Sequence, residues 1–429
     1  MDISAIILAA GESSRFWPLA SNKHKSMYHL LGKPALSFTL EGLKNLGVKK
    51  AVIVKQPDDE SIENYFGNGE RIGIEIKYAI QEKPLGMGNA VLSAEKEIDS
   101  DYFFVLNADQ VNAEDLGGDM LNLLNSRTDI DSVLASQKTT TPENYGILEI
   151  ENEKAKSIEE KPAPGTEKSN QMVIGIYLLA KRFLDTLKSV ETRQYSYEEA
   201  LGKYMTEYDT VGVNKFEDIP EITIKFPWHL FNLNKYLMDK FLKASYISEK
   251  ARISPTAIIL GNVHIEDNVR VFEHAVIKGP AYIREGAIIG NNSLIRDYSY
   301  IGENTIVGYS TEIKHSILFD NVETHKNFIG DSIVDEYTGF GAGTITANRR
   351  LDRENIKSRI KGKNVDSGFT FLGNVIGMNV HTGIQVGLMP GVKIGNNSNI
   401  GALTNVSKDV EDDTFVYSKQ DLIIRKYKK

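Results

Sequence analysis

Aliphatic side chains recur at every sixth position through the second half of the sequence. Eleven consecutive positions of this series are isoleucine or valine, from Ile253 to Ile313. An amphipathic α-helix repeats every 3.6 residues and a half-buried strand every two residues, so neither explains a period of six. A parallel β-helix with a triangular cross-section gives this period, because each flat face of a coil buries one aliphatic side chain. The series therefore predicts a parallel β-helix of hexapeptide repeats.

The six-residue frame is interrupted once. It is lost between Leu318 and Ile376 and returns from Leu388 to Val406. The interruption contains the string Gly341-Ala-Gly-Thr-Ile-Thr-Ala-Asn348. An inserted loop is where a bare β-helix acquires function, whereas an uninterrupted one can serve as an oligomerisation spine alone.

The first half alternates short apolar runs with helical patterns. The predicted strands are Ser4–Ala9, Lys50–Val54, Ile74–Ile80 and Tyr102–Leu106. The predicted helices are Pro34–Leu46, Gly86–Lys96 and Ala113–Leu124, with a connecting helix at Lys235–Lys243. This alternation indicates a mostly parallel α/β sheet covered by helices, which binds ligands at the carboxyl ends of its strands.

Composition excludes several classes of function. A length of 429 residues indicates two or three domains, and a net charge of −8 argues against a nucleic-acid-binding protein. The absence of cysteine excludes disulfides, zinc–thiolate sites and cysteine nucleophiles. No run has the length of a membrane span, and none has the pattern of a signal peptide. We therefore expect a soluble protein of the cytoplasm with no nucleic-acid or membrane partner.

Short polar motifs follow the predicted strands in a fixed order. The first is Leu8-Ala-Ala-Gly-Glu-Ser-Ser-Arg15, a small-residue turn that lets backbone N–H groups approach phosphates. Val105-Leu-Asn-Ala-Asp109 places a carboxylate at a strand end, where a metal ion would meet those phosphates. The other members of the series are Lys25, Gly32-Lys-Pro34, Gln81-Glu-Lys-Pro-Leu-Gly86, Tyr145-Gly146 and Glu160-Lys161-Pro162.

This ordered series resembles the sugar-1-phosphate nucleotidylyltransferases over roughly residues 1–235. The resemblance implies that a nucleoside triphosphate and a sugar 1-phosphate are joined with release of pyrophosphate. It implies a triphosphate held by Ala10, Gly11 and the catalytic Arg15, with the catalytic Lys25 on the reacting phosphates. It further assigns the nucleobase to Gln81 and Gly86, Mg²⁺ to Asp109, and the sugar phosphate to Tyr145, Gly146, Glu160 and Lys161.

Three positions depart from that family's pattern. Ser13 replaces the second glycine of the first loop, and His24 replaces the proline before the catalytic lysine. Thr223 stands where relatives often have a second metal-binding aspartate. A catalytically silent, sugar-nucleotide-binding regulatory protein is therefore one alternative.

The interruption in the repeat carries a second resemblance. With Arg296, Lys314 and His325, the string that ends at Asn348 resembles the acetyltransferase half of the bifunctional UDP-N-acetylglucosamine synthesis enzymes, most closely their archaeal-type relatives. It implies His325 as the general base that deprotonates an amino sugar before attack on acetyl-CoA. Arg296 and Lys314 would hold the sugar phosphate, Asn348 the amine or acyl group, with Lys357 near by and Ala402 contacting acetyl-CoA.

Two positions depart from the acetyltransferase pattern. Phe328 replaces a tyrosine, and Gly339 replaces an asparagine. Each replacement removes a hydrogen bond to the ligand. A glucose-1-phosphate thymidylyl- or uridylyltransferase with a β-helix that only oligomerises is the other alternative.

Together these features predict an α/β protein with a Rossmann-like nucleotidyltransferase sheet at residues 1–233 and a connecting helix at 234–250. A left-handed parallel β-helix acyltransferase domain with a C-terminal tail is expected at 251–429. The expected enzyme acetylates glucosamine 1-phosphate or a related amino-sugar 1-phosphate and transfers a uridylyl or thymidylyl group to the product. The expected co-substrates are acetyl-CoA and UTP or dTTP, the expected metal is Mg²⁺, and the family resemblance implies a homotrimer.

Overall fold

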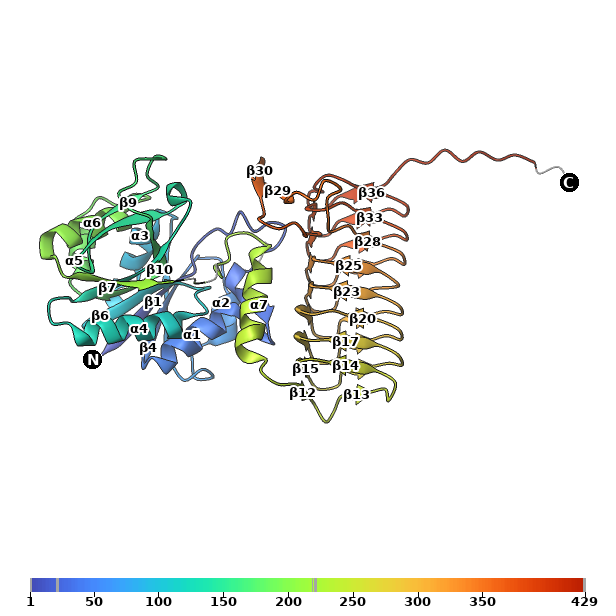
Figure 1. Cartoon of the computed structure of the whole chain (residues 1–429), viewed down its shortest axis with the longest axis horizontal. Helices are drawn as coiled ribbons and strands as arrows, with labels where there is room; N and C mark the ends of the chain where they lie inside the picture. Colours follow the sequence, from blue (N-terminus) through green and yellow to red (C-terminus); the bar gives the residue numbers. More distant parts are fainter. Residues whose placement is uncertain (1, 21–22, 218, 220–221, 427–429) are drawn as a thin grey trace. The chain divides into compact units, whose positions relative to one another are not determined.

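Two compact units make up the chain, and Figure 1 shows their elements. The computed structural model describes residues 2–20, 23–217, 219 and 222–426. Residues 427–429 of the predicted C-terminal tail lie outside the described residues. The first unit contains Met1–Ser13, Asn22–Tyr28 and Lys33–Thr223, and the second contains Ser14–Ser21, His29–Gly32 and Ile224–Lys429.

A nine-stranded sheet forms the centre of the first unit, in the order β5-β4-β1-β6-β10-β7-β11-β9-β8. Its strands are β1 (Ile3–Leu8), β4 (Lys50–Lys55), β5 (Glu75–Ile80), β6 (Tyr102–Asn107), β7 (Ser132–Lys138), β8 (Gly146–Glu151), β9 (Lys154–Glu160), β10 (Gln171–Ala180) and β11 (Val211–Phe216). Two further strands are short, β2 (His29–Leu30) and β3 (Lys33–Pro34).

Helices cover both faces of this sheet. The alternation of side chains along β1 separates two apolar cores, with Ile7 in one and Ile6 in the other. Helices α1 (Ala35–Asn45) and α4 (Ala113–Ser126) pack into the core of Ile7. The core of Ile6 is covered by α3 (Met87–Ser93), α5 (Phe183–Lys188) and α6 (Ser196–Tyr208). The remaining helices of this unit are α2 (Ser61–Phe66) and the 3₁₀ turns Lys25–Met27, Glu95–Glu97 and Pro142–Asn144.

The strands and helices predicted for the first 126 residues are confirmed, with ends that differ by a few residues. The parallel arrangement holds for β5, β4, β1 and β6. Beyond them the sheet is mixed, because β10 runs antiparallel to both β6 and β7. Parallel neighbours need a long crossover, whereas β10 follows the β8–β9 hairpin without an intervening helix.

A parallel β-helix forms most of the second unit, as the six-residue period predicts. Its first face is the sheet of β12 (Tyr246–Ile247), β15 (Val263–Ile265), β18 (Ala281–Ile283), β21 (Ser299–Ile301), β24 (Ile317–Leu318), β26 (Ile333–Val334), β31 (Val375–Ile376) and β34 (Lys393–Ile394). The second face contains β13 (Arg252–Ile253), β16 (Arg270–Val271), β19 (Ile288–Ile289), β22 (Ile306–Val307), β27 (Gly339–Phe340), β32 (His381–Thr382), β35 (Asn399–Ile400) and β37 (Phe415–Val416). The third face contains β14 (Ile258–Leu260), β17 (Val276–Lys278), β20 (Leu294–Ile295), β23 (Glu312–Lys314), β25 (Phe328–Gly330), β28 (Ile345–Thr346), β33 (Gly387–Leu388) and β36 (Asn405–Val406).

The register of the coils explains both the repeat and its interruption. Ile259, Ile277 and Ile295 pair in succession on the third face, each one coil of three six-residue segments from the next. Later coils are shorter, and Leu318 pairs with Val334 on the first face. Val334 then pairs with Ile376, because the residues between them include an antiparallel hairpin of β29 (Lys357–Ile360) and β30 (Lys363–Asp366). The six-residue frame is therefore lost in the sequence although the stack of coils continues.

Helix α7 (His229–Phe241) packs against the corners that lead from the third face of the β-helix to the first. The ring of Phe231 stacks on His315 with centroids 5.2 Å apart, and Asn234 Nδ2 donates to the carbonyl of Tyr298 at 2.9 Å. The helix begins six residues before the predicted Lys235, because the apolar face that docks it starts at Leu230. No helix in the described part of the chain is long and apolar enough to cross a membrane.

Candidate active sites

A cavity of about 280 Å³ lies in the first unit, where the parallel strands β1, β5 and β6 end. It is lined by six of the residues that the sequence assigned to nucleotide and metal: Ala10, Gly11, Lys25, Gln81, Gly86 and Asp109. Leu8, His24, Pro84, Met87, Ala90, Asn107 and Gln194 complete the lining. The residues of four separate motifs therefore meet in one place.

An ion pair joins the predicted metal ligand to the predicted catalytic lysine. Asp109 Oδ2 lies 3.2 Å from Lys25 Nζ, and the Asp109 side chain is only 2% exposed. Asp109 follows the end of β6, and Lys25 begins the 3₁₀ turn Lys25–Met27. A buried carboxylate and an ammonium group at a cavity wall are suited to a metal ion and to phosphate oxygens, respectively.

The two glycines of the cavity serve different purposes. A Cβ atom on Gly11 would meet nothing within 4 Å, so its absence leaves room for a ligand to approach the backbone. Gly86 has φ +96°, and a Cβ there would lie 2.4 Å from the carbonyl oxygen of Gln194. Gln81 Nε2 donates to the Gly86 carbonyl and to Asn89 Oδ1, both at 3.0 Å, which fixes the amide plane.

The residues predicted to hold the sugar phosphate gather at the start of β8 and the end of β9. Gly146 pairs with Glu160, and Lys161 donates its backbone N–H to the carbonyl of Tyr145 at 2.9 Å. Lys161 Nζ lies 3.0 Å from Glu160 Oε1, and this hydrogen bond raises the pKa of the lysine. A Cβ on Gly146 would come within 2.9 Å of Glu160 Oε2, so only glycine leaves that carboxylate in place. None of these residues lines the 280 Å³ cavity.

In the second unit, a buried aspartate connects two of the predicted acetyltransferase residues. Asp331 Oδ2 lies 2.6 Å from Lys314 Nζ and 2.5 Å from Asn348 Nδ2. Burial opposes ionisation of Asp331, but contacts from His315, Lys314 and Asn348 outweigh it and lower the pKa of the carboxyl group. Lys314 and Asn348 are therefore oriented by an anion that the sequence analysis did not identify.

The other predicted acetyltransferase residues lie at different corners of the coils. Arg296 follows β20 at the same edge of the third face as Lys314, and its Nη1 lies 3.2 Å from Glu312 Oε1. His325 precedes β25, so it lies at the opposite edge of that face, with an exposed side chain. Ala402 is exposed at a corner of a later coil.

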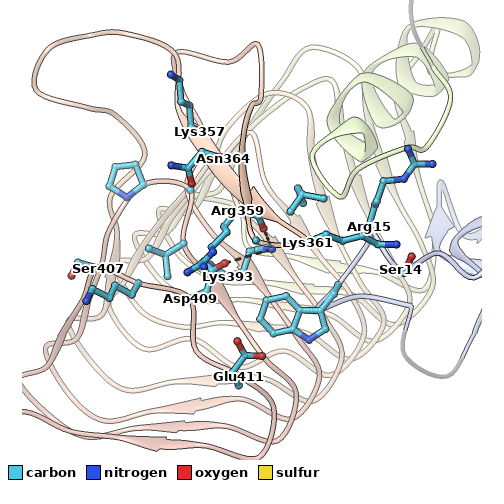
Figure 2. A pocket seen from close by; sticks show the side chains of 17 residues that line it. Ser14, Arg15, Lys357, Arg359, Lys361, Asn364, Lys393, Ser407, Asp409 and Glu411 are labelled. Atoms are coloured by element: carbon cyan, nitrogen blue, oxygen red, sulfur yellow. Dashed lines mark hydrogen bonds and ion pairs between the residues drawn. The ribbon is translucent and has the colours of Figure 1, made fainter. Parts of the chain in front are cut away.

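Arg15 and Lys357 both line a larger cavity of about 680 Å³ in the second unit (Figure 2). Arg15 does not line the cavity that contains Gly11 and Lys25. Its segment is held against the last coils, because Trp17 Nε1 donates to Asp412 Oδ1 at 3.1 Å and Asn396 Nδ2 donates to the Pro18 carbonyl at 3.0 Å. The roles assigned to Arg15 and Lys357 remain predictions.

Comparison with known proteins identifies the family of this chain. The model of the nucleotidyl transferase family matches residues 4–219. The bifunctional protein GlmU of Methanococcus vannielii is 38% identical over 99% of this chain and 100% of its own length. The bifunctional protein GlmU of Methanococcus maripaludis strain C7 is 41% identical over 99% of each chain. The chain belongs to the bifunctional GlmU family.

A more distant relative has the same two-part description. The bifunctional sugar-1-phosphate nucleotidylyltransferase/acetyltransferase of Sulfurisphaera tokodaii is 30% identical over 95% of this chain and 98% of its own length. The GlmU-type resemblance that the motifs indicated is thus confirmed over both units.

The local backbone shows what two departures from the nucleotidyltransferase pattern change. Ser13 has φ +49°, a left-handed conformation that glycine adopts without strain and serine does not. His24 caps the 3₁₀ turn that begins at Lys25, because its Nδ1 accepts from the backbone N–H of Ser26 at 3.3 Å. His24 thus fixes the entry to the turn, which the proline of the pattern would do through its ring. Thr223 does not line the 280 Å³ cavity.

The two acetyltransferase departures lie at crowded positions. The ring of Phe328 fills the space beside Gly330, where a Cβ atom would come within 2.7 Å of it. A Cβ on Gly339 would lie 2.8 Å from His381 Nδ1, so His381 occupies the space that an asparagine side chain would need.

Sequence reasoning did not identify Asp331, Asn107 or Gln194 as site residues. Asp331 has φ +48°, a conformation that Asp and Asn tolerate better than most residues, but it lies where the six-residue frame is lost, so no corner was predicted there. Asn107 stands two residues before Asp109 at the end of the same strand. Gln194 gave no signal, because its backbone reaches the cavity only through the packing of the segment before α6 against Gly86.

We predict that His24 makes the first unit less stable in mild acid. Burial, together with the neighbouring Lys25 charge, lowers the pKa of His24 to about 4, below its usual 6.5. The neutral ring is therefore favoured on folding, and the associated stability is lost as pH falls from about 6.5 towards 4. When the pH is lowered from 7.5 to 5, this one group should reduce the free energy of unfolding by about 2 kcal/mol. The measurement is urea unfolding of wild type and His24→Asn at both pH values, followed by helical circular dichroism.

Asparagine is a good capping residue that does not titrate, so His24→Asn is a matched replacement. The pH-dependent loss should be about 2 kcal/mol smaller in the variant than in wild type. An equal loss in both proteins would mean that His24 is not buried in the neutral form.

Proposed function

We propose that this protein N-acetylates glucosamine 1-phosphate or a close relative with acetyl-CoA, and then couples the product to a pyrimidine nucleotide with release of pyrophosphate. Two observations together support the proposal: each unit contains its own cluster of candidate site residues, and the similarity to bifunctional enzymes extends over the whole chain. The Lys25–Asp109 cavity lies in the first unit and the Lys314–Asp331–Asn348 cluster in the second. The alignments with bifunctional relatives cover 99% and 95% of this chain and so extend over both units.

Nucleotidyl transfer in the first unit needs charge and positioning more than it needs an acid or a base. An oxygen of the sugar phosphate attacks the α-phosphorus of the nucleotide, and the bond to the departing pyrophosphate breaks. The open space at Gly11 lets the backbone approach the triphosphate, and the Lys25 ammonium group offsets its negative charge. Arg15 does not line this cavity, so its predicted role as a second cation on the phosphates is supported by the family resemblance alone.

The base would be recognised by the amide of Gln81. Its Nε2 already donates to Gly86 and Asn89, which leaves the carbonyl oxygen to accept an N–H from the ring. Uracil and thymine both carry such a donor, so this contact suits UTP and dTTP equally. The choice between the two nucleotides therefore depends on other residues.

Asp109 is the residue that would hold Mg²⁺. Its carboxylate is a hard oxygen donor at the wall of the cavity, and Mg²⁺ often binds to one or two carboxylates together with substrate phosphates. The described residues include no group of three His, Cys, Asp or Glu side chains around a common point, so the phosphates would have to supply further ligands. When bound, the ion would add positive charge where the pyrophosphate group leaves.

Acetyl transfer in the second unit requires a neutral amine. In the proposal His325 takes a proton from the amino sugar, the amine nitrogen bonds to the thioester carbon, and the carbon–sulfur bond breaks to release CoA. Lys314 and Arg296 would bind the sugar phosphate from one edge of the third face. Asn348, oriented by Asp331, would donate a hydrogen bond to the acyl oxygen.

A homotrimer is the assembly that this arrangement favours. In the first six strands of the third face, the outward column runs through Ile258, Val276, Leu294, Glu312, Phe328 and Ile345, and all but Glu312 are apolar; Gly387 and Asn405 continue the column. Ile258 and Ile345 are each 49% exposed, so the column needs a partner. His325 and Lys314 lie at opposite edges of this face in one chain, and a neighbouring copy would bring the two edges together.

Replacement of the metal ligand should separate the two activities. Asp109→Asn keeps the size of the side chain but removes its charge, so pyrophosphate release should fall at least about 100-fold. Acetyl-CoA consumption by the same preparation should stay within twofold of wild type. Asp119→Asn, on the exposed side of α4, is the matched control and should retain both activities. Equal loss of both activities in Asp109→Asn would mean that the substitution acts through folding.

Replacement of the proposed base should give the opposite pattern. His325→Asn should reduce acetyl transfer at least about 100-fold, the usual contribution of a general base, while pyrophosphate release is kept. His274→Asn is the control, because His274 is also exposed at a corner of the β-helix. Initial rates with glucosamine 1-phosphate and acetyl-CoA provide the measurement. An unchanged rate in His325→Asn would assign His325 a purely structural role.

A further inference from the structure

The 680 Å³ cavity of the second unit has a strongly basic lining. Its walls come from the β29–β30 hairpin, the coil ends near Gly391 and Ser407, and the segment from Ser14 to Trp17. Six cationic side chains line it: Arg15, Lys357, Arg359, Lys361, Lys393 and Lys408. Only two carboxylates, Asp409 and Glu411, face them. A local excess of cations in a chain of net charge −8 indicates a site for an anion.

Lys393 is buried at the base of this cavity. Its side chain is 4% exposed, and its Nζ lies 3.5 Å from Asp409 Oδ2 and donates to the carbonyl of Arg359. The ammonium group also lies over the ring of Trp17, 4.7 Å from its centroid. Burial lowers the pKa of this lysine even though Asp409 opposes the change. A bound anion would relieve that destabilisation of the charged form.

Five further cations surround Lys393 in this cavity. Among the residues that the structure describes, Arg15, Lys357, Arg359, Lys361 and Lys408 form no ion pair with a carboxylate. Figure 2 shows Lys361 extending towards Ser14 and Arg15, whereas Arg359 extends towards Asp409. The hairpin therefore presents charge to both ends of the cavity. Around one hollow, these five exposed cations create a positive potential that an anion lying between them would offset.

We propose that this cavity binds an organic diphosphate or triphosphate. Several phosphate charges are needed to match the cations, and a volume of about 680 Å³ is that of a small-molecule site, much larger than a single phosphate. The ligand's phosphates contact Arg359, Lys361 and Lys393, and its organic part lies towards Trp17. The inference does not depend on the proposed activities, because it concerns binding alone.

Tryptophan fluorescence offers a direct probe of this site. The chain has two tryptophans. Trp17 lines the cavity, and Trp228 is 1% exposed in the core. The first probe is inorganic triphosphate, titrated into the full-length protein without metal. We expect a saturable change of fluorescence that is absent in Trp17→Phe.

Charge removal on the hairpin tests the location of binding. The double variant Arg359→Gln/Lys361→Gln should raise the dissociation constant for inorganic triphosphate at least about tenfold, because two charged hydrogen bonds are lost. Lys278→Gln removes a cation elsewhere on the β-helix, outside the cavity lining, and should not change it. Equal affinity of the double variant and wild type would overturn the proposal.

The cavity of the first unit could also bind a triphosphate, so a further variant separates the two. Lys25→Gln should leave the Trp17 response intact. Loss of that response in Lys25→Gln, with retention in the hairpin variant, would assign binding to the first unit and contradict the proposal. Titrations with UTP, CoA and a UDP-sugar then identify the source of the phosphates, since all three contain a diphosphate group. A stronger response to single-stranded nucleic acid than to any of these would contradict a small-molecule site.

Discussion

The inward aliphatic side chains of the β-helix are the constraint on which the second unit depends. Each coil contributes one of them per face, and parallel pairing stacks residues such as Ile277 and Ile295 in a continuous core. A change of one residue in register would turn this series outward, so the repeat fixes the position of every corner. Arg296 and Lys314, which we propose to bind the sugar phosphate, directly follow inward isoleucines, so the core sets the edge that they share.

The shortened coils and the hairpin are local exceptions that the stacked core tolerates. They bring Asp331 to a corner beside Lys314 and Asn348, and they add the β29–β30 hairpin. In the first unit, the candidate site residues lie at the ends of parallel strands, where Gly11, Gln81 and Asp109 line one cavity. Both units thus place polar residues where regular backbone ends, which keeps reactive groups on a rigid frame.

Much of this organisation is predictable from sequence because it rests on local or periodic signals. The period of six predicted the β-helix, and the ordered motifs, with the family resemblance that they carry, predicted six of the residues that line the 280 Å³ cavity. Contacts between distant segments gave no such signal. Trp17 bonds to Asp412 and Pro18 to Asn396, so the segment that carries Arg15 belongs by its contacts to the β-helix unit. Asp331 was missed because its importance comes from two partners that are remote in sequence, Lys314 and Asn348.

If our proposal is right, one chain performs acetyl transfer and nucleotidyl transfer in succession. A time course followed by ³¹P NMR measures this order, with glucosamine 1-phosphate, acetyl-CoA, UTP and Mg²⁺ present together and CoA release measured in parallel. We expect an N-acetylated sugar 1-phosphate to appear first, followed by a UDP-sugar and pyrophosphate. Formation of pyrophosphate and a UDP-sugar without consumption of acetyl-CoA would contradict the proposal and leave the β-helix as a scaffold.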